Sequence, residues 1–334
     1  MPQILTMNKN LINHRDTEAQ RKNKFKKISA SPCLYGKFFI ILLILSCLAP
    51  TYLFSADLNL IASLSGDKIM GKFNQPSAVF FDELKKRLYV ADTGNNRLVS
   101  FDHEFNFISE FDAGGKLKYP TSIVKNSKEQ FFVVGGTARD ELFLIDIPKK
   151  IFKPIKIKNI IARENPFLPD NLAIDKDDNL YITDRGNGRI LVVDSNGRFL
   201  KEIAVENKFV DLTDVQIDTE GNIYSLSTLE GKVYIFNNKE GSVSSFGKRG
   251  SRANEFEFPV SIAISPNRFV YVLDKHKGNV LVFKKDGNFQ FNMLKKGWGN
   301  GEIYEPSYIY IDKGNKIYIV DRGNNRIQIF QGGK

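Results

Sequence analysis

Few side chains in this sequence have the type and spacing that catalysis or metal binding requires. Both cysteines, Cys33 and Cys47, lie within the first 56 of the 334 residues, so the rest of the chain has no disulfide, thiolate metal ligand or cysteine nucleophile. Only His103 and His276 follow residue 56, and two histidines cannot form a three-histidine zinc centre within one chain. The G-x-S-x-G and phosphate-loop motifs are also absent. This inventory favours a binding protein over an enzyme.

One acidic segment, DKDDN at residues 175–179, has a composition that suits calcium. It lacks the glycine and the distal glutamate of an EF-hand loop. Polar residues of these types are also ordinary in a turn between two strands. We therefore interpret the segment as a solvated turn and expect no cofactor, with calcium as the alternative.

A second polar motif occurs three times, as DTGNNR at residues 92–97, DRGNGR at 184–189 and DRGNNR at 321–326. Its aspartate can accept hydrogen bonds from the free N–H groups of a turn, and its arginine can pair with an aspartate of the same or a neighbouring unit. Its glycine supplies permissive backbone angles, and the asparagine that follows tolerates the left-handed conformation. We therefore interpret the motif as turn chemistry, with structural roles for Asp92, Gly94, Asn95, Arg97, Asp184, Gly186, Asn187, Arg189, Asp321, Gly323, Asn324 and Arg326.

These motifs belong to a longer repeat. Short apolar segments begin at residues 75, 119, 168, 211, 258 and 305, which are 44, 49, 43, 47 and 47 residues apart. Each is followed by a second and a third apolar segment, and all but the last unit have a weaker fourth. Six units of four short strands with a period in the forties predict an all-β fold, a six-bladed β-propeller with four-stranded antiparallel blades.

The last unit ends at Lys334 after only three strands, so its fourth strand must come from elsewhere. The segment LNLIASLS at residues 58–65 precedes the first unit and has the pattern of a strand. We expect it to pair beside residues 325–331 as the fourth strand of the last blade. This pairing would join the two ends of the ring and cover sheet edges that would otherwise be exposed.

The first 56 residues form a different region. They carry a net charge of +6, whereas residues 57–334 carry only +4 of the total of +10. Basic residues precede an uncharged apolar run, FFIILLILSCLAPTYLF, at 38–54. We expect residues 1–37 to be a disordered cytoplasmic arm, residues 38–56 to be a hydrophobic helix that acts as a signal peptide or transmembrane anchor, and residues 57–334 to be the propeller.

The apolar run has a length between that of a signal-peptide core and that of a membrane span. Cleavage near Ser55 and Ala56 and retention as an anchor both remain open, and lipidation at Cys47 is a third possibility. All three place the propeller outside the cytoplasm, at the cell surface or in the periplasm.

The motifs DTGNNRLVSFD, DRGNGRILVVD and DRGNNRIQIF, together with FGKRGSRANEFEFPVSIAIS at residues 246–265, resemble the NHL-repeat family of propellers over residues 58–334. The resemblance implies an interaction module, because many NHL propellers bind other molecules and some form the extracellular sensor of bacterial receptor kinases. It also leaves an enzyme open, because related propellers include a metal-dependent lyase and calcium-dependent lactonases.

In a four-stranded blade, the turns between strands two and three share a face with the links to the next blade. This face would gather many cations, with Lys275 and Lys277 nearby, and the only tryptophan of the chain. An exposed tryptophan beside cations is a plausible binding anchor, although it could instead cover the core. The candidate binding residues are Lys116, Lys118, Arg185, Lys248, Arg249, Arg252, Lys295, Lys296, Trp298 and Arg322.

We therefore expect an exported or membrane-anchored NHL-repeat propeller that acts as a non-catalytic binding or scaffold module for a protein, a peptide or an envelope glycan. The alternative is a metal-dependent hydrolase or lyase, with Asn171 and Asp214 near the starts of inner strands as candidates for a calcium lactonase. RNA binding ranks third, because export separates the domain from RNA and its charge is nearly balanced. Membrane contact would involve residues 38–54 if they are retained, and the oligomeric state is left open.

Overall fold

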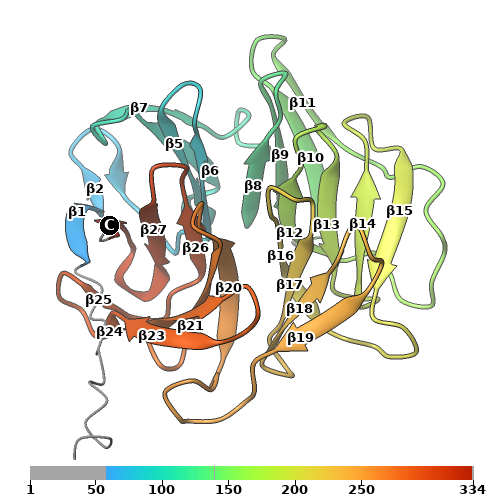
Figure 1. The fold of residues 1–334 in the computed structure, drawn as a ribbon. Helices are drawn as coiled ribbons and strands as arrows, with labels where there is room; N and C mark the ends of the chain where they lie inside the picture. The colour runs from blue at the N-terminus through green and yellow to red at the C-terminus, as the bar shows by residue number, and fades with distance from the viewer. Residues whose placement is uncertain (1–57, 139, 333–334) are drawn as a thin grey trace, which may run out of the picture. The chain divides into compact units, whose positions relative to one another are not determined.

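The computed structural model describes residues 58–138 and 140–332, which form six four-stranded antiparallel sheets arranged as a ring of blades (Figure 1). The basic arm and the apolar segment predicted at residues 1–37 and 38–56 lie outside the described residues. Within the described part of the chain, no helix is long and apolar enough to span a membrane.

Each of the first five blades takes its four strands from one continuous stretch of chain. Their strands are β4 (Ala78–Asp82), β5 (Arg87–Asp92), β6 (Arg97–Phe101) and β7 (Phe107–Phe111); β8 (Ser122–Lys125), β9 (Gln130–Gly135), β10 (Glu141–Asp146) and β11 (Ile151–Pro154); β12 (Pro169–Ile174), β13 (Leu180–Asp184), β14 (Arg189–Val193) and β15 (Phe199–Ala204); β16 (Leu212–Ile217), β17 (Ile223–Ser227), β18 (Lys232–Phe236) and β19 (Val243–Phe246); and β20 (Pro259–Ile264), β21 (Phe269–Asp274), β22 (Asn279–Lys284) and β23 (Phe289–Met293).

The sixth blade joins the two ends of the described chain. It contains β26 (Tyr308–Ile311), β27 (Lys316–Asp321), β28 (Arg326–Gln331) and, as its fourth strand, β1 (Asn59–Leu64). β1 pairs antiparallel with β28, from Asn59 opposite Gln331 to Leu64 opposite Ile327. The predicted closure of the ring by the N-terminal strand is therefore confirmed.

The core lies between neighbouring blades. The innermost strands β4, β8, β12, β16, β20 and β26 contact one another in sequence, and β26 contacts β4 to complete the ring. The second strand of a blade is covered on both faces by adjacent blades, so it is apolar along its length rather than alternating. In β13, for example, every residue from Leu180 to Asp184 is buried. Aromatic side chains such as Phe132, Tyr224 and Tyr318 fill the space between blades.

The repeated polar motif forms the same hydrogen-bonded turn in three blades. In the last blade, Asp321 is fully buried, and its Oδ1 accepts a bond from the backbone N–H of Tyr304 in the preceding linker (2.7 Å). Its Oδ2 accepts bonds from Asn324 Nδ2 (2.8 Å) and Arg326 Nε (2.7 Å). Asp92 and Asp184 make the equivalent bonds in their own blades. The aspartate therefore ties the linker, the turn and the third strand together, which supports the structural interpretation of the motif.

The predicted reason for the motif glycines is wrong. Gly94, Gly186 and Gly323 have no left-handed φ; a Cβ at Gly94 would instead lie 2.7 Å from the carbonyl oxygen of Asn74. Equivalent close approaches of 2.6 Å occur at Gly186 and Gly323, so glycine is needed because the linker backbone passes against the turn. The asparagines that follow, Asn95, Asn187 and Asn324, are not left-handed either. That conformation falls one residue later, at Asn96 (φ 57°), Gly188 (φ 62°) and Asn325 (φ 52°).

Candidate functional site

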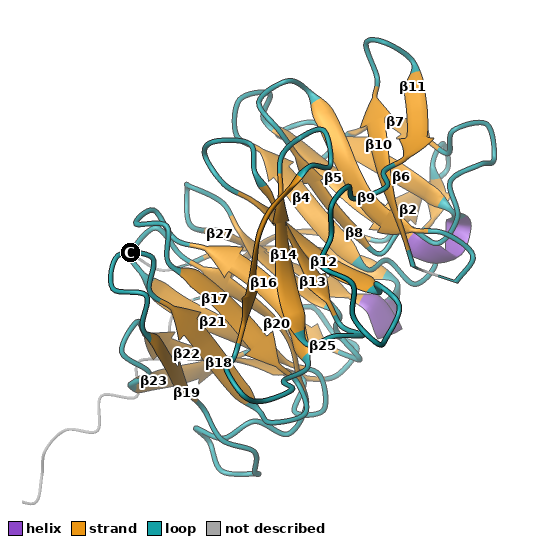
Figure 2. Ribbon diagram, turned by 90° about the vertical axis from the view of Figure 1, so that its right-hand side faces the viewer, coloured by secondary structure: helices purple, strands orange, loops and turns teal. Residues whose placement is uncertain are grey.

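One end of the ring carries the turns between the second and third strands together with the linkers between blades. The short 3-10 helices Thr93–Asn95 and Arg322–Asn324 lie at this end (Figure 2). Backbone bonds join five of the six turns to their linkers, as from Gly94 N–H to Asn74 O (2.8 Å), and in the fourth blade the N–H of Leu229 donates to the side chain of Asp211 (2.8 Å). These bonds confirm the predicted grouping. We call this end the linker face; it comprises linkers 65–77, 112–121, 155–168, 205–211, 247–258 and 294–307 and turns 93–96, 136–138, 185–188, 228–231, 275–278 and 322–325.

Trp298 projects from the last linker into solvent, with 72% of its surface exposed. The suggestion that this ring covers the core is therefore wrong. Its ring lies against Tyr304 with centroids 5.4 Å apart, and the Nζ of Lys296 lies 5.9 Å from the centre of the Tyr304 ring. These side chains form an exposed aromatic platform with one adjacent cation, an arrangement that suits a binding anchor.

The loop that carries Trp298 is fixed on both sides of the ring. β24 (Lys295–Lys296) and β25 (Glu302–Ile303) pair in parallel across its base. Its glycine carbonyls accept bonds from Asn324 Nδ2, at Gly297 O (3.1 Å), and from Arg326 Nη2, at Gly299 O (2.7 Å). Binding through a loop already held in place costs less conformational entropy than binding through a mobile one.

Most of the cations predicted for this face already have partners within the protein. Lys295 pairs with Glu302 (3.0 Å), and Lys248 and Arg252 both pair with Glu255. Lys116 and Lys118 are exposed and make no ion pair with any described residue. The other cations also have partners: Arg185 pairs with Asp170, Lys275 with Glu305, Arg322 with Gln75, and Lys277, Lys296 and Arg249 with backbone carbonyls. The face is therefore not a continuous basic surface.

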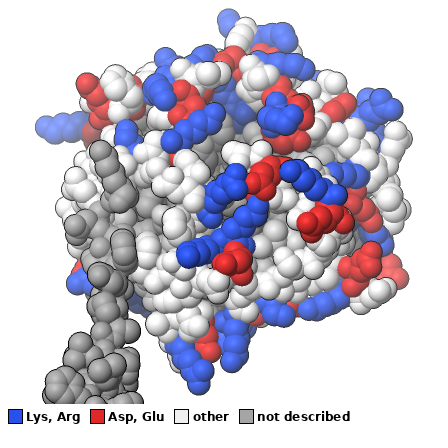
Figure 3. Space-filling view, viewed as in Figure 1, with Lys and Arg blue, Asp and Glu red and all other residues white. Residues whose placement is uncertain are grey.

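The opposite end of the ring is also balanced in charge. Figure 3 views the end that carries the C-terminus, where basic and acidic side chains alternate over the surface. Ion pairs there include Lys86 with Glu83 (3.2 Å) and Lys285 with Glu220 (2.8 Å). Neither end presents the single-sign field expected of a nucleic-acid interface.

A ring of polar side chains lines the centre of the propeller. Each innermost strand is the free edge of its sheet, so its N–H groups need acceptors from the neighbouring blade. Asp214 Oδ2 accepts the N–H of Ile262 (2.8 Å) and the hydroxyl of Ser261 (2.8 Å), and Ser261 Oγ accepts the N–H of Ile309 (3.3 Å). Ser122 and Asn171 make the corresponding link between blades two and three. These residues hold adjacent blades together.

The side-chain oxygen atoms of Asp214 and Asn171, the residues suggested for a calcium site, therefore already accept hydrogen bonds. The other oxygen of Asp214 accepts the N–H of Val215 (2.7 Å), and Asn171 Oδ1 accepts bonds from Ser122 Oγ (2.9 Å) and Leu172 N–H (2.9 Å). Among the described residues, no group of three or more His, Cys, Asp and Glu side chains is placed to hold a metal ion. The donor set at the centre does not fit a calcium ion.

The remaining candidates for metal binding are separate from one another. His103 is exposed beside Glu104, whereas the ring of His276 stacks on Phe258 with centroids 4.6 Å apart. In the acidic turn, Asp175 Oδ1 accepts the N–H groups of Asp177 and Asn179, both at 2.9 Å. This geometry supports the interpretation of residues 175–179 as a hydrogen-bonded turn.

Burial raises the pKa of Asp214 to about 7, although the Ile262 N–H, the Ser261 hydroxyl and the Val215 N–H oppose this shift. Because the folded-state pKa lies above the unfolded value near 4, the native state binds the proton more tightly. The free energy of unfolding should therefore fall as pH rises from about 4 to 7 and the contribution of this group should be constant above that range. The Asp214→Asn variant lacks this pH-dependent contribution to the free energy of unfolding.

Denaturant unfolding of both proteins between pH 4.5 and 8.5 checks this expectation. Relative to Asp214→Asn, the wild type should lose about 3 kcal/mol over this range, from roughly 1.4 kcal/mol per pKa unit. Asp177→Asn, at an exposed position, should follow the wild-type curve. Parallel curves for wild type and Asp214→Asn would show that Asp214 does not titrate with a raised pKa.

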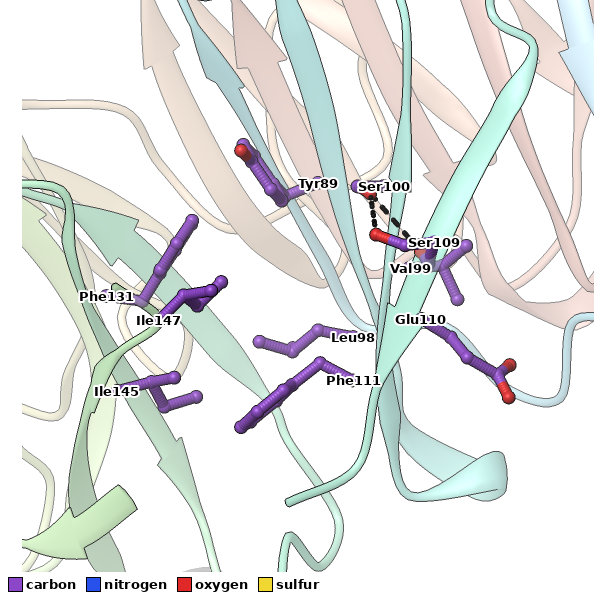
Figure 4. Close-up of a pocket in the computed structure, with 10 residues that line it drawn as sticks. All are labelled: Tyr89, Leu98, Val99, Ser100, Ser109, Glu110, Phe111, Phe131, Ile145 and Ile147. Carbon is purple, nitrogen blue, oxygen red and sulfur yellow. Dashed lines mark hydrogen bonds between the residues drawn. The ribbon is translucent and has the colours of Figure 1, made fainter. Parts of the chain in front are cut away.

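A small, partly open gap of about 40 Å³ lies between the first two blades (Figure 4). The side chains of Leu98, Phe111, Phe131 and Ile145 point toward one another across it, while Glu110 points away. Ser100 and Ser109 at its border bond to each other (2.9 Å). The gap is apolar and far smaller than the roughly 300–1,000 Å³ of small-molecule sites, so it is a packing gap between blades.

A larger open cavity of about 580 Å³ lies on the linker face, lined by Ala162, Arg163, Glu164, Asn165, Asn187 and Phe209. Neither this cavity nor Phe209 was predicted from the sequence. The signal was present, because Phe209 is an aromatic residue in a linker, outside the strand pattern, as Trp298 is. Its neighbour Asn187 was assigned only to the turn.

The fold defines the class of protein: the chain is a six-bladed β-propeller. Residues 261–331 match a protein family described as 6-bladed beta-propeller. No curated protein matches the sequence. An auxiliary nutrient binding protein from Bacteroides thetaiotaomicron is similar in structure at 12% identity and a TM-score of 0.63, with 83% of this chain and 76% of that chain covered.

Two further solved structures are similar. A second auxiliary nutrient binding protein, from Bacteroides ovatus, has 14% identity and a TM-score of 0.61, with 82% of this chain and 73% of that chain covered. Virginiamycin B lyase from Staphylococcus aureus has 14% identity and a TM-score of 0.58, with 82% and 85% covered. At such low identity these likenesses concern the fold, which hosts both binding proteins and enzymes.

Proposed function

We propose that this chain is an exported or membrane-anchored propeller of the NHL type that acts as a binding module outside the cytoplasm. The three DxGN(N/G)R turns support the NHL assignment, and the basic arm followed by the apolar run at 38–54 supports export. The partner is a protein, a peptide or an envelope polymer that contacts the linker face.

The observation that carries this proposal is the fixed exposure of Trp298. A tryptophan that is 72% exposed in a tightly bonded loop has the residue type and the fixed position typical of a binding hot spot. The balanced charges around it favour a partner that is uncharged or mixed in charge over a strongly acidic one. The binding proteins of similar fold are consistent with this role.

Co-sedimentation of the full chain with insoluble cell-envelope material from its native cells tests the proposal. Trp298→Ala should weaken binding roughly 30-fold, which corresponds to the loss of about 2 kcal/mol at a binding hot spot. Leu84→Ala, at a side chain that is 85% exposed in a turn remote from the linkers, is the matched control and should bind as the wild type does. Equal affinity of Trp298→Ala and wild type would contradict the proposal.

A further inference from the structure

The cavity beside Phe209 combines an aromatic ring with several polar groups. Phe209 is 61% exposed at the edge of the cavity, in the linker between blades three and four. The volume of the cavity, about 580 Å³, lies within the range of roughly 300–1,000 Å³ that small-molecule sites occupy. The cavity lies on the same face as Trp298 but in a different linker.

The Phe209 ring is held in place by the neighbouring turn. A Cβ at Gly188 would lie 2.9 Å from Phe209 Cδ2 and 2.7 Å from the carbonyl oxygen of Val210, so the ring and its backbone pack directly on this glycine. Val210, the next residue, is 1% exposed and anchors the linker in the core between blades. The ring therefore has one face fixed by packing while most of its surface stays in water.

The two asparagines that line the cavity each have a side-chain oxygen that can accept a hydrogen bond from a ligand. The Nδ2 of Asn165 donates to Gly186 O (3.0 Å), and the Nδ2 of Asn187 donates to Asp184 Oδ2 (2.9 Å). These bonds fix both amide groups. The Oδ1 atom of neither residue accepts a hydrogen bond from a described residue, so both are available to hydroxyl donors.

The charges at the cavity are close to balanced. Arg163 pairs with Glu202, which also pairs with Arg189, whereas Glu164 is exposed and has no ion pair within the described chain. An anionic ligand in the cavity would meet Glu164, and a cationic ligand would meet Arg163. A neutral ligand with many hydroxyl groups can donate to the amide and carboxylate oxygens without meeting an unfavourable charge.

On these grounds we infer that the Phe209 cavity is a subsite for a neutral saccharide, with the apolar face of a sugar ring on Phe209 and its hydroxyls bonded to Asn165, Asn187 and Glu164. This assignment rests on the proposed function, because it takes the linker face as the ligand face. It specifies that function further, since it selects a neutral glycan from the partner classes named above.

Isothermal titration of the full chain with the hexasaccharides of glucose, mannose and N-acetylglucosamine tests the subsite, with an oligogalacturonate as the acidic counterpart. At least one neutral hexasaccharide should bind. Phe209→Ala should weaken that binding at least about tenfold, the size expected when a stacked aromatic is lost. Leu229→Ala, 63% exposed on the same face but outside the cavity lining, should leave the affinity unchanged.

The possible outcomes separate the subsite from the proposed function. If Trp298→Ala weakens hexasaccharide binding and Phe209→Ala does not, the subsite is wrong while the linker face stays the ligand face. If no neutral hexasaccharide binds but wild type still sediments with envelope material in a Trp298-dependent manner, the saccharide class is wrong and the binding function stands. Binding of the oligogalacturonate as tightly as the neutral sugars would overturn the assignment of a neutral ligand.

Discussion

Two prolines placed in β1, by Ser63→Pro and Leu64→Pro, are expected to prevent the ring from closing. These residues are adjacent, and in an antiparallel ladder successive residues alternate in the direction of their N–H groups, so one of the two N–H groups points at β28. The proline at that position removes a ladder hydrogen bond, and the acceptor left without a partner on β28 costs about 1–3 kcal/mol. This is a sizeable part of the stability of a typical domain, roughly 5–15 kcal/mol.

Loss of β1 has consequences beyond its own bonds. Leu60 packs against the cluster that contains Phe330 and Ile317, and this cluster would be exposed to water. β28 would become a free sheet edge. We therefore expect the variant either to unfold at least 10 °C below the wild type, at about 2–4 °C per kcal/mol, or to fail to fold.

The control for this experiment is a pair of prolines in β19, Ser244→Pro and Ser245→Pro. β19 is also the fourth strand of its blade, but its blade is continuous in sequence, so the damage should be local. Thermal unfolding of the full-length variants, followed by circular dichroism, provides the comparison. A β19 variant as unstable as the β1 variant, or more so, would show that closure by β1 has no special importance.

Asp321→Asn is expected to destabilise the protein by about 3–5 kcal/mol, the range for breaking a buried ion pair. Asp321 is fully buried and accepts bonds from Tyr304, Asn324, Arg326 and Gln328. The substitution would leave Arg326 with only backbone carbonyl acceptors, at Gly299 and Glu302, and would place an N–H donor among other donors.

The same substitution should loosen the Trp298 platform. Asn324 and Arg326 anchor the loop through the carbonyls of Gly297 and Gly299, and Asp321 holds both of these side chains in position. Denaturant unfolding measures the stability, and the fluorescence anisotropy of the single tryptophan measures the mobility. Asp177→Asn, an exposed aspartate, should change the free energy of unfolding by less than about 0.5 kcal/mol. A similarly small change in Asp321→Asn would contradict the role given to the buried aspartate.

The sequence was sufficient to predict the propeller, its closing strand and the turn role of Asp92, Asp184 and Asp321. These features repeat along the chain, and repetition makes a local pattern informative. The function of the motif glycines was not predictable in this way, because Gly94 is required by the linker that passes 2.7 Å from its Cβ position, a tertiary contact. The left-handed residue was misplaced by one position because the turn forms a short 3-10 helix in two of the three motifs, and its left-handed C-cap is Asn96 or Asn325.

The candidate site was less predictable. A lone tryptophan among glycines suggested an anchor, but only the structure shows that Trp298 is exposed and that Lys295 is paired with Glu302. The link from Asp214 to Ser261 joins residues 47 positions apart, and it depends on how adjacent blades face each other. These residues occupy equivalent positions in their repeats, which is the signal that would have revealed the central ring.

The proposed function depends most on an exposed and ordered Trp298 that a ligand covers. The intrinsic fluorescence of the protein measures the exposure of this side chain directly. The chain has one tryptophan, so its emission reports this position alone. We predict the red-shifted emission of a water-exposed indole with high anisotropy in the free protein, and a shift to shorter wavelength as soluble envelope polymer is added. An emission that is already blue-shifted in the free protein, or that does not change while the polymer binds, would contradict the account.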